Sequence, residues 1–407
     1  MRAREIRALG DLAGTGLGGV AARVQDLHES IADRVFTEVG PVSAPVRAAH
    51  DGIAGAVYAS VAAALTAGGR AAGAIAAVRA GDDADADSVA EAPRGRVAQA
   101  ILNAWCGDEL DRSGSPLALA MTVRAEGRPV RLEPDALAEA HPDATGRVAV
   151  FLHGLSETEG AWSYKSTAHY GRPGVTFGRR LRDDLFYTPV YIRYNTGLRV
   201  HDNGLRLDEL LTGLIEQWPV EVEELLLVGH SMGGLVVRSA LAQSGSDWPT
   251  LVRHTVTLGS PHLGAPLERG AEYAARTLGR WRETRAVAAV IDARSGGIKD
   301  LRRGTLLAGE HRPVPLHEGA RHFVVLATVA SRPGSRLADL LGDGLVQPDS
   351  ACGDTRDDHR MPFPDEHVRR LPRLHHFDLL NHPRVYECLH GWLADRDTAG
   401  DAASETA

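Results

Sequence analysis

The sequence predicts an α/β fold, in which a mostly parallel central sheet is flanked by helices and preceded by a helical appendage. Short apolar runs occur between residues 147 and 329, and the segments between them have helical periodicity. Such runs are typical of strands buried on both faces of a parallel sheet. The runs are RVAVFL at 147–152, PVYIRY at 189–194, ELLLV at 224–228, LVRHTVTL at 251–258 and HFVVLATV at 322–329. A chain of 407 residues also has room for a second unit.

The first 80 residues are expected to form a helical hairpin. Apolar residues recur at three- and four-residue steps over 20–35 and again over 53–65. The apolar faces of the two expected helices consist largely of Ala and Val. The helices would therefore pack on each other, on a second copy or on a lipid surface. A G-x-G-x-x-G match at 14–19 follows no strand, which argues against a dinucleotide site.

The domain division rests on composition and loop length. Residues 81–95 are acidic and poor in apolar side chains, as in a solvated linker. The α/β domain is expected over 96–396, followed by a disordered tail at 397–407. More than sixty residues separate the last two apolar runs, so a cap insertion is predicted at about 262–320. Apolar residues in this stretch suggest a lid, namely Leu306, Leu307, Val314 and Leu316.

Charge and cysteine content narrow the class of protein. The net charge is −8 and no basic stripe is present, which argues against a nucleic-acid partner. Cys106, Cys352 and Cys388 are too scattered for a disulfide framework. We read no signal peptide and no apolar run long enough to span a membrane. A cytoplasmic protein is expected, with peripheral membrane attachment left open.

The pentapeptide Gly229-His230-Ser231-Met232-Gly233 has the form G-x-S-x-G. It directly follows the apolar run at 224–228 and precedes a helical segment beginning GLVVRSAL. This order of strand, sharp turn and helix is what a nucleophile elbow requires. Ser231 is therefore the predicted nucleophile.

An oxyanion hole is predicted beside this elbow. His153 and Gly154 form a turn at the end of the first central strand, which would present a backbone N–H to the serine. In hydrolases with such an elbow, the second donor is the amide of the residue after the nucleophile. The predicted donors are the amides of Leu155 and Met232.

The acid and the base are expected to follow the serine in that order. Asp343 lies between two glycines at a turn after the last apolar run, and is the preferred acid. The competing acids lie in helical or highly polar stretches, namely Asp339, Asp349, Asp354, Asp357 and Asp358.

The base should lie in a loop just ahead of the last helix. His376 fits best, because the apolar residues after it can anchor such a loop, and His375 remains the alternative. His382 and His390 fit the start and the surface of the helix better.

Five motifs in this order resemble the lipase and esterase branch of the α/β-hydrolase fold, and within it bacterial proteins related to GPI inositol-deacylases. They are FLHGL, VGHSMGG, TLGSPHLGAPL, GDGLV and HHFDLLNHP, within about residues 117–395. The resemblance implies Ser231 as nucleophile, Asp343 as acid and His376 as base. It also implies an oxyanion hole at Leu155 and Met232, and places the TLGSPHLG loop near the pocket.

The expected activity is hydrolysis of carboxylic esters, lipid-like or acyl, through an acyl-enzyme. Two alternatives stay open: an acyltransferase or thioesterase with the same triad, and a noncatalytic helical interaction protein on a hydrolase scaffold. No cofactor is expected, and the histidines show no metal-binding spacing. The expected partners are a small-molecule or lipid ester, together with a membrane surface or a second copy bound through the N-terminal helices.

Overall fold

The structure is a computed structural model, and it describes residues 2–13, 63, 66–75, 93–265, 295–309, 314–331, 343, 345–352, 361 and 363–404. The chain divides into two compact units. The first comprises Met1–Gly95 with Gly114–Leu117, and the second Arg96–Ser113 with Ala118–Ala407.

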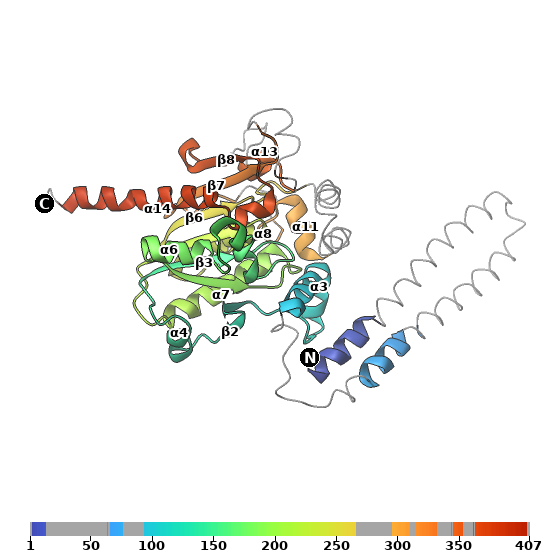
Figure 1. The fold of residues 1–407 in the computed structure, drawn as a ribbon. Coiled ribbons are helices and arrows are strands. Elements are labelled where there is room, and N and C mark those ends of the chain that lie inside the picture. The colour runs from blue at the N-terminus through green and yellow to red at the C-terminus, as the bar shows by residue number, and fades with distance from the viewer. Residues whose placement is uncertain are drawn as a thin grey trace, which may run out of the picture. The chain divides into compact units, whose positions relative to one another are not determined.

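The second unit is built on an eight-stranded sheet (Figure 1). Its strands are β1 (Thr122–Ala125), β2 (Arg128–Val130), β3 (Arg147–Leu152), β4 (Thr188–Arg193), β5 (Glu224–His230), β6 (Val252–Leu258), β7 (Arg321–Thr328) and β8 (Val368–Pro372). The spatial order is β2-β1-β4-β3-β5-β6-β7-β8. The six strands from β4 to β8 in this order are parallel, whereas β1 pairs antiparallel with both β2 and β4. The carboxyl ends of the parallel strands therefore meet at one edge of the sheet, where ligands bind in open α/β sheets.

Both faces of the sheet are buried, as the apolar runs predicted. Along β3, Val148, Val150 and Leu152 belong to one core cluster, whereas Ala149 and Phe151 belong to the other. Helices α7 (Val200–Glu216) and α8 (Met232–Gln243) contribute to the first cluster, and α6 (Phe177–Leu185) and α14 (Pro383–Ser404) to the second. The unit thus has three layers, with the sheet in the middle.

Further helices and 3₁₀ turns accompany these elements. They are α3 (Pro93–Arg112), α4 (Pro134–Ala140), α5 (Ser166–Tyr170), α11 (Gly296–Arg303), α13 (Pro348–Cys352) and the 3₁₀ turns η2 (Glu159–Ser163), η3 (Trp248–Leu251), η4 (Asp365–His367) and η5 (His376–Leu380). A turn at Glu126-Gly127 joins β1 to β2, and both residues have positive φ, at 49° and 81°. A two-residue turn of this kind matches the twist of the strands it joins.

Three parts of the second unit differ from the sequence expectations. β8 was not predicted. Leu306 is buried in the core, and Leu307, Val314 and Leu316 pack against it, so these residues do not form a separate lid; residues 266–294 and 310–313 lie outside the described part. The last helix continues to Ser404, through most of the segment expected to be disordered.

The first unit contains helical segments at 3–13 and 66–75. Their backbones are in close contact, because a Cβ on Gly10 would lie 2.4 Å from the Cα of Gly73. Most of the predicted stripes at 20–35 and 53–65, and the glycine motif at 14–19, lie outside the described residues. Within the described part of the chain, no helix combines the length and the apolar character needed to cross a membrane.

Candidate active site

Ser231 occupies a sharp turn between β5 and α8. Its backbone has φ 51° and ψ −119°, a conformation that residues with a Cβ adopt at a cost of about 1–3 kcal/mol. The turn is held by a hydrogen bond from the Ser231 amide to the Leu258 carbonyl, at 2.9 Å, and by one from the Gly234 amide to the Ser231 carbonyl, at 3.2 Å. The serine is 8% exposed. This is the backbone geometry of a nucleophile elbow.

The glycines of the pentapeptide allow close approaches of the backbone. A Cβ on Gly229 would lie 2.4 Å from the Gly234 nitrogen, and a Cβ on Gly233 would lie 2.4 Å from the Leu152 carbonyl oxygen. The first turn of α8 is therefore packed directly on the end of β3. Because Leu152 is also paired with Gly229 in the sheet, the loop that follows β3 lies beside the elbow.

The two predicted oxyanion donors come from these adjoining segments. Met232 is the first residue of α8, where backbone N–H groups have no partner within the helix. Leu155 lies three residues beyond the end of β3. Within the described residues, neither amide has a recorded acceptor in the chain. The loop itself is fixed by the Tyr194 hydroxyl, which donates to the His153 carbonyl at 2.8 Å, and by stacking of the His153 and Tyr194 rings.

His376 and Asp343 form a buried pair, and the Nδ1 atom of His376 lies 2.7 Å from Oδ2 of Asp343. The side chains are 4% and 2% exposed. Burial alone would lower the pKa of His376, but the Asp343 carboxylate outweighs this effect, so the pKa is raised above its ordinary value. The carboxylate thus fixes a ring whose Nε2 is left to act on a substrate or a nucleophile.

This pair lies next to the elbow. Leu258, which accepts the Ser231 amide, is followed by Gly259 at φ 61°. A Cβ on Gly259 would lie 3.1 Å from both Asp343 Oδ2 and His376 Cε1. The His230 and His376 rings are 4.7 Å apart between centroids. Among the described residues no hydrogen bond joins Ser231 to His376, and such bonds are often long before substrate binds.

His375, the alternative base, points elsewhere. Its Nε2 lies 3.3 Å from Lys165 Nζ and 3.2 Å from Asp378 Oδ2. Lys165 also contacts Asp378 Oδ1 at 2.9 Å, and Asp378 Oδ2 accepts the His375 amide at 3.1 Å. The structure therefore brings His376, and not His375, to Asp343. Lys165 and Asp378 hold the turn that carries His376, and the sequence reasoning had assigned neither to the site.

Glu157 is another residue that the sequence reasoning missed. Its Oε2 accepts the Gly154 amide at 2.7 Å and lies 3.0 Å from Nδ1 of His230. Burial alone would raise the pKa of Glu157, but the facing His230 ring and the Gly154 N–H leave it below its ordinary value. No local motif marks this residue, since Gly154 is three residues away in the same loop but His230 comes from the end of β5.

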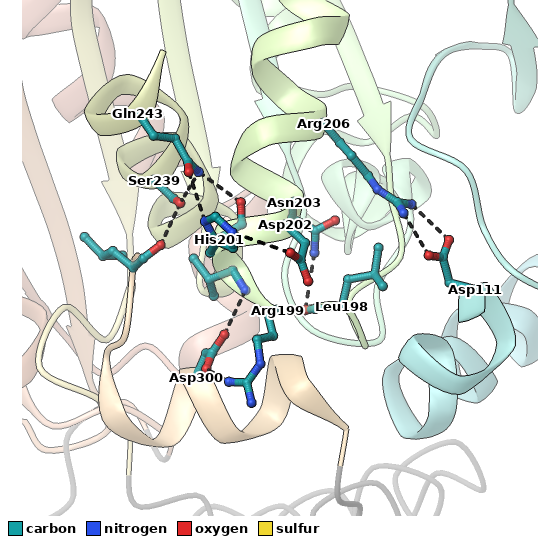
Figure 2. Close-up of polar contacts among 12 residues, drawn as sticks. Asp111, Leu198, Arg199, His201, Asp202, Asn203, Arg206, Ser239, Gln243 and Asp300 are labelled. Carbon is teal, nitrogen blue, oxygen red and sulfur yellow. Dashed lines mark hydrogen bonds and ion pairs between the residues drawn. The ribbon is translucent and has the colours of Figure 1, made fainter. Parts of the chain in front are cut away.

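Helix α11, within the predicted insertion, is fixed beside the elbow. A Cβ on Gly297 of α11 would lie 3.1 Å from Met232 Cε, so α11 packs against the residue after Ser231. Asp300 of α11 accepts the Val200 amide at 3.0 Å, at the start of α7, and pairs with Arg199 at 2.8 Å (Figure 2). Burial raises the pKa of Asp300. One buried carboxylate therefore joins α11 to α7.

His262 of the TLGSPHLG segment is buried behind the elbow. Its ring lies 3.3 Å from Arg238 and 3.3 Å from the Thr257 hydroxyl, and burial sets its pKa well below the ordinary value. His382 precedes α14, and His390 lies within it. Within the described ranges, no three His, Cys, Asp or Glu side chains are arranged to hold a metal ion.

Residues 176–308 match the family model described as a PGAP1-like alpha/beta domain. No curated protein gave a significant match. A lipase, BlEst2 of Bacillus licheniformis in mature form, is 19% identical, with 67% of this chain and 97% of that chain covered and a TM-score of 0.43.

Two further solved structures give weaker matches. The Pyrococcus furiosus esterase Pf2001 is 14% identical, with 62% of this chain and 82% of that chain covered and a TM-score of 0.37. The phospholipase PlaB of Legionella pneumophila is 15% identical, with 51% of this chain and 46% of that chain covered and a TM-score of 0.34.

A mostly parallel eight-stranded sheet with a serine elbow after β5 defines the α/β-hydrolase fold in this chain. Within that class, residues 176–308 are similar to the family model of a PGAP1-like alpha/beta domain.

Proposed function

We propose that this protein is a serine hydrolase that cleaves carboxylic esters. The proposal rests on one observation. A serine with elbow geometry and a buried His376–Asp343 pair lie at the same edge of the sheet, although they come from segments far apart in the sequence. A serine needs a neighbouring base to become a nucleophile, and the base needs a group that orients it. The buried His376–Asp343 pair supports these two roles.

In the proposed mechanism, His376 Nε2 takes the proton of Ser231 as Oγ attacks the ester carbonyl. The Leu155 and Met232 amides stabilise the negative charge that forms on the carbonyl oxygen. His376 then gives its proton to the leaving alcohol, which leaves an acyl-enzyme. Water, deprotonated by the same imidazole, repeats the attack and releases the acid and the free serine.

The proposed substrate class is a lipid-like or acyl ester. The motifs shared with GPI inositol-deacylase-like proteins support this class, and the predicted N-terminal helices would offer an apolar surface for peripheral membrane attachment. Rates measured on nitrophenyl esters of increasing acyl length should rise beyond the acetate. A flat series would contradict a lipid-like acyl group without contradicting ester hydrolysis.

The first test is labelling with a fluorophosphonate, which reacts with an activated serine. The full-length protein should be labelled, and the Ser231→Ala variant should not. Ser156→Ala is the matched control, because Ser156 has a similar φ of 59° and lies in the loop after β3, but has no proposed catalytic role. Failure of the folded full-length protein to react, or equal labelling of Ser231→Ala, would refute the proposal.

A second assay, on the reaction products, separates ester hydrolysis from acyl transfer. Product analysis in the presence of an added alcohol or thiol should show the free acid as the main product. A product that is mostly the new ester or thioester would favour the acyltransferase alternative while keeping the triad.

A further inference from the structure

We propose that Glu157 is a positioning residue that ties the oxyanion loop, the elbow and the His376 turn into one unit through His230. This inference rests on the proposed function, since it assigns Glu157 a part in the same reaction. Glu157 Oε2 accepts the Gly154 amide at 2.7 Å, next to the proposed oxyanion donor Leu155. The same oxygen lies 3.0 Å from His230 Nδ1, directly before the nucleophile.

The third connection runs through the other side of the His230 ring. Its Nε2 atom lies 3.2 Å from the backbone carbonyl oxygen of His376. A single carboxylate oxygen is therefore linked to a segment that follows β3, to the end of β5, and, through one ring, to the turn that carries the base. No other contact described above reaches all three segments.

The His230 ring lies between two oxygens that can only accept hydrogen bonds, one on the Glu157 carboxylate and one on the His376 carbonyl. The His230 side chain is fully buried and that of Glu157 is 10% exposed. Removing one partner of such a pair leaves a buried charge or an unpaired donor, so the pair must be kept or lost together.

The same strand offers a matched comparison. Glu224, at the opposite end of β5, lies 3.1 Å from His254 Nδ1 and is also 10% exposed. This second buried Glu–His pair contacts neither the elbow nor the His376 turn. Glu224 also accepts a hydrogen bond from Tyr187 and pairs with Arg147 at 3.6 Å, so its substitution reports the stability cost of losing a buried carboxylate at the other end of the strand.

The experiment compares Glu157→Gln with Glu224→Gln in the full-length protein. Glutamine keeps the size of the side chain but removes its charge. In Glu157→Gln, kcat should fall about 10- to 100-fold with KM little changed, because small errors in the position of catalytic groups are costly. In Glu224→Gln, kcat should remain within about twofold of wild type. A second variant, His230→Gln, should reproduce the fall in kcat if Glu157→Gln folds poorly.

Hydrogen exchange provides a readout that does not depend on turnover. Peptides covering 153–158 and 375–381 should exchange faster in Glu157→Gln, and should not change in Glu224→Gln. Unchanged exchange in those peptides, or equal losses of kcat in the two variants, would overturn the proposal. If wild type shows no activity that depends on Ser231, the proposed function fails, and the exchange result still decides whether Glu157 joins the three segments.

Discussion

Asp343 contacts His376 with one carboxylate oxygen and its own turn with the other. Oδ2 lies 2.7 Å from His376 Nδ1, while Oδ1 accepts the amides of Leu345 and Val346 at 2.9 and 2.8 Å. The backbone of the turn thus holds the carboxylate in place before any substrate arrives. The carboxylate in turn keeps the hydrogen of the imidazole on Nδ1, so that Nε2 is free to accept a proton.

Asp343→Asn should lower kcat about 10⁴-fold, because an amide does not hold the required tautomer of His376. The variant should stay folded, since its remaining oxygen can still accept the two turn amides. Steady-state rates on a nitrophenyl ester and a thermal melt check both points. Asp208→Asn is the control, because Asp208 contacts Trp248 and Ser244 away from the site. An Asp343→Asn variant with near-normal kcat would show that another acid serves His376.

The pH dependence of kcat/KM follows from the raised pKa of His376. The base must be neutral to accept a proton, so activity should rise with pH and reach half its maximum above about pH 6.5, the ordinary value for histidine. Asp343 contacts the ring, the His230 ring lies 4.7 Å from it, and the charge of Glu157 also raises its pKa. Asp343→Asn should move the midpoint of its residual activity to lower pH, since a negative charge is removed. A wild-type midpoint clearly below 6.5 would contradict this account.

Gly259→Ala should impair catalysis by displacing the base. The new Cβ would lie 3.1 Å from both Asp343 Oδ2 and His376 Cε1, and 2.8 Å from Leu379 Cδ1. Gly171→Ala is the matched control, since Gly171 has a similar φ of 72° but has no atom within 4 Å of the added Cβ. Both variants should lose about 1 kcal/mol of stability from backbone strain, and Gly259→Ala more. Only Gly259→Ala should show a large fall in kcat; equal kcat in the two variants would contradict the proposed site.

Asp300→Ala should destabilise the protein more than Asp111→Ala. Asp300 is 4% exposed and accepts the buried Val200 amide, whereas Asp111, at 32%, forms a more exposed pair with Arg206 (Figure 2). Loss of the acceptor for a buried amide costs about 1–3 kcal/mol, and an exposed ion pair contributes about 0–1 kcal/mol. Urea unfolding curves measure the difference. Similar losses in the two variants would show that Asp300 does not fix α11 to α7.

The buried strands were readily predicted from the sequence, because a strand covered on both faces needs an apolar side chain at nearly every position. The run at 147–152 coincides with β3, and the other four predicted runs lie within two residues of their strands. β8 was missed because it lies at the edge of the sheet and is not covered in this way: Arg369 and Arg370 are exposed. Its sequence, VRRLP, has no apolar run to detect.

The site was predictable where a short motif fixes both the residue and its backbone. Ser231 and the turn after β3 are of this kind. Glu157 is different, because Gly154 is its only partner nearby in the sequence, whereas His230 and, through His230, His376 are brought to it by the fold. The predicted lid depended on apolar composition alone, which does not distinguish a mobile cover from a core segment such as that containing Leu306.

The contact between Lys165 and Asp378 also makes the site chemically addressable. Lys165 and Lys299 are the only lysines in the sequence, so an amine-directed reagent has very few side chains to attack. The Lys165 side chain is 40% exposed and contacts His375 and Asp378, on either side of His376 in the sequence. A fluorophore attached to that amine would therefore lie beside the turn that carries the proposed base, and could report on the arrival of a ligand without any engineered cysteine.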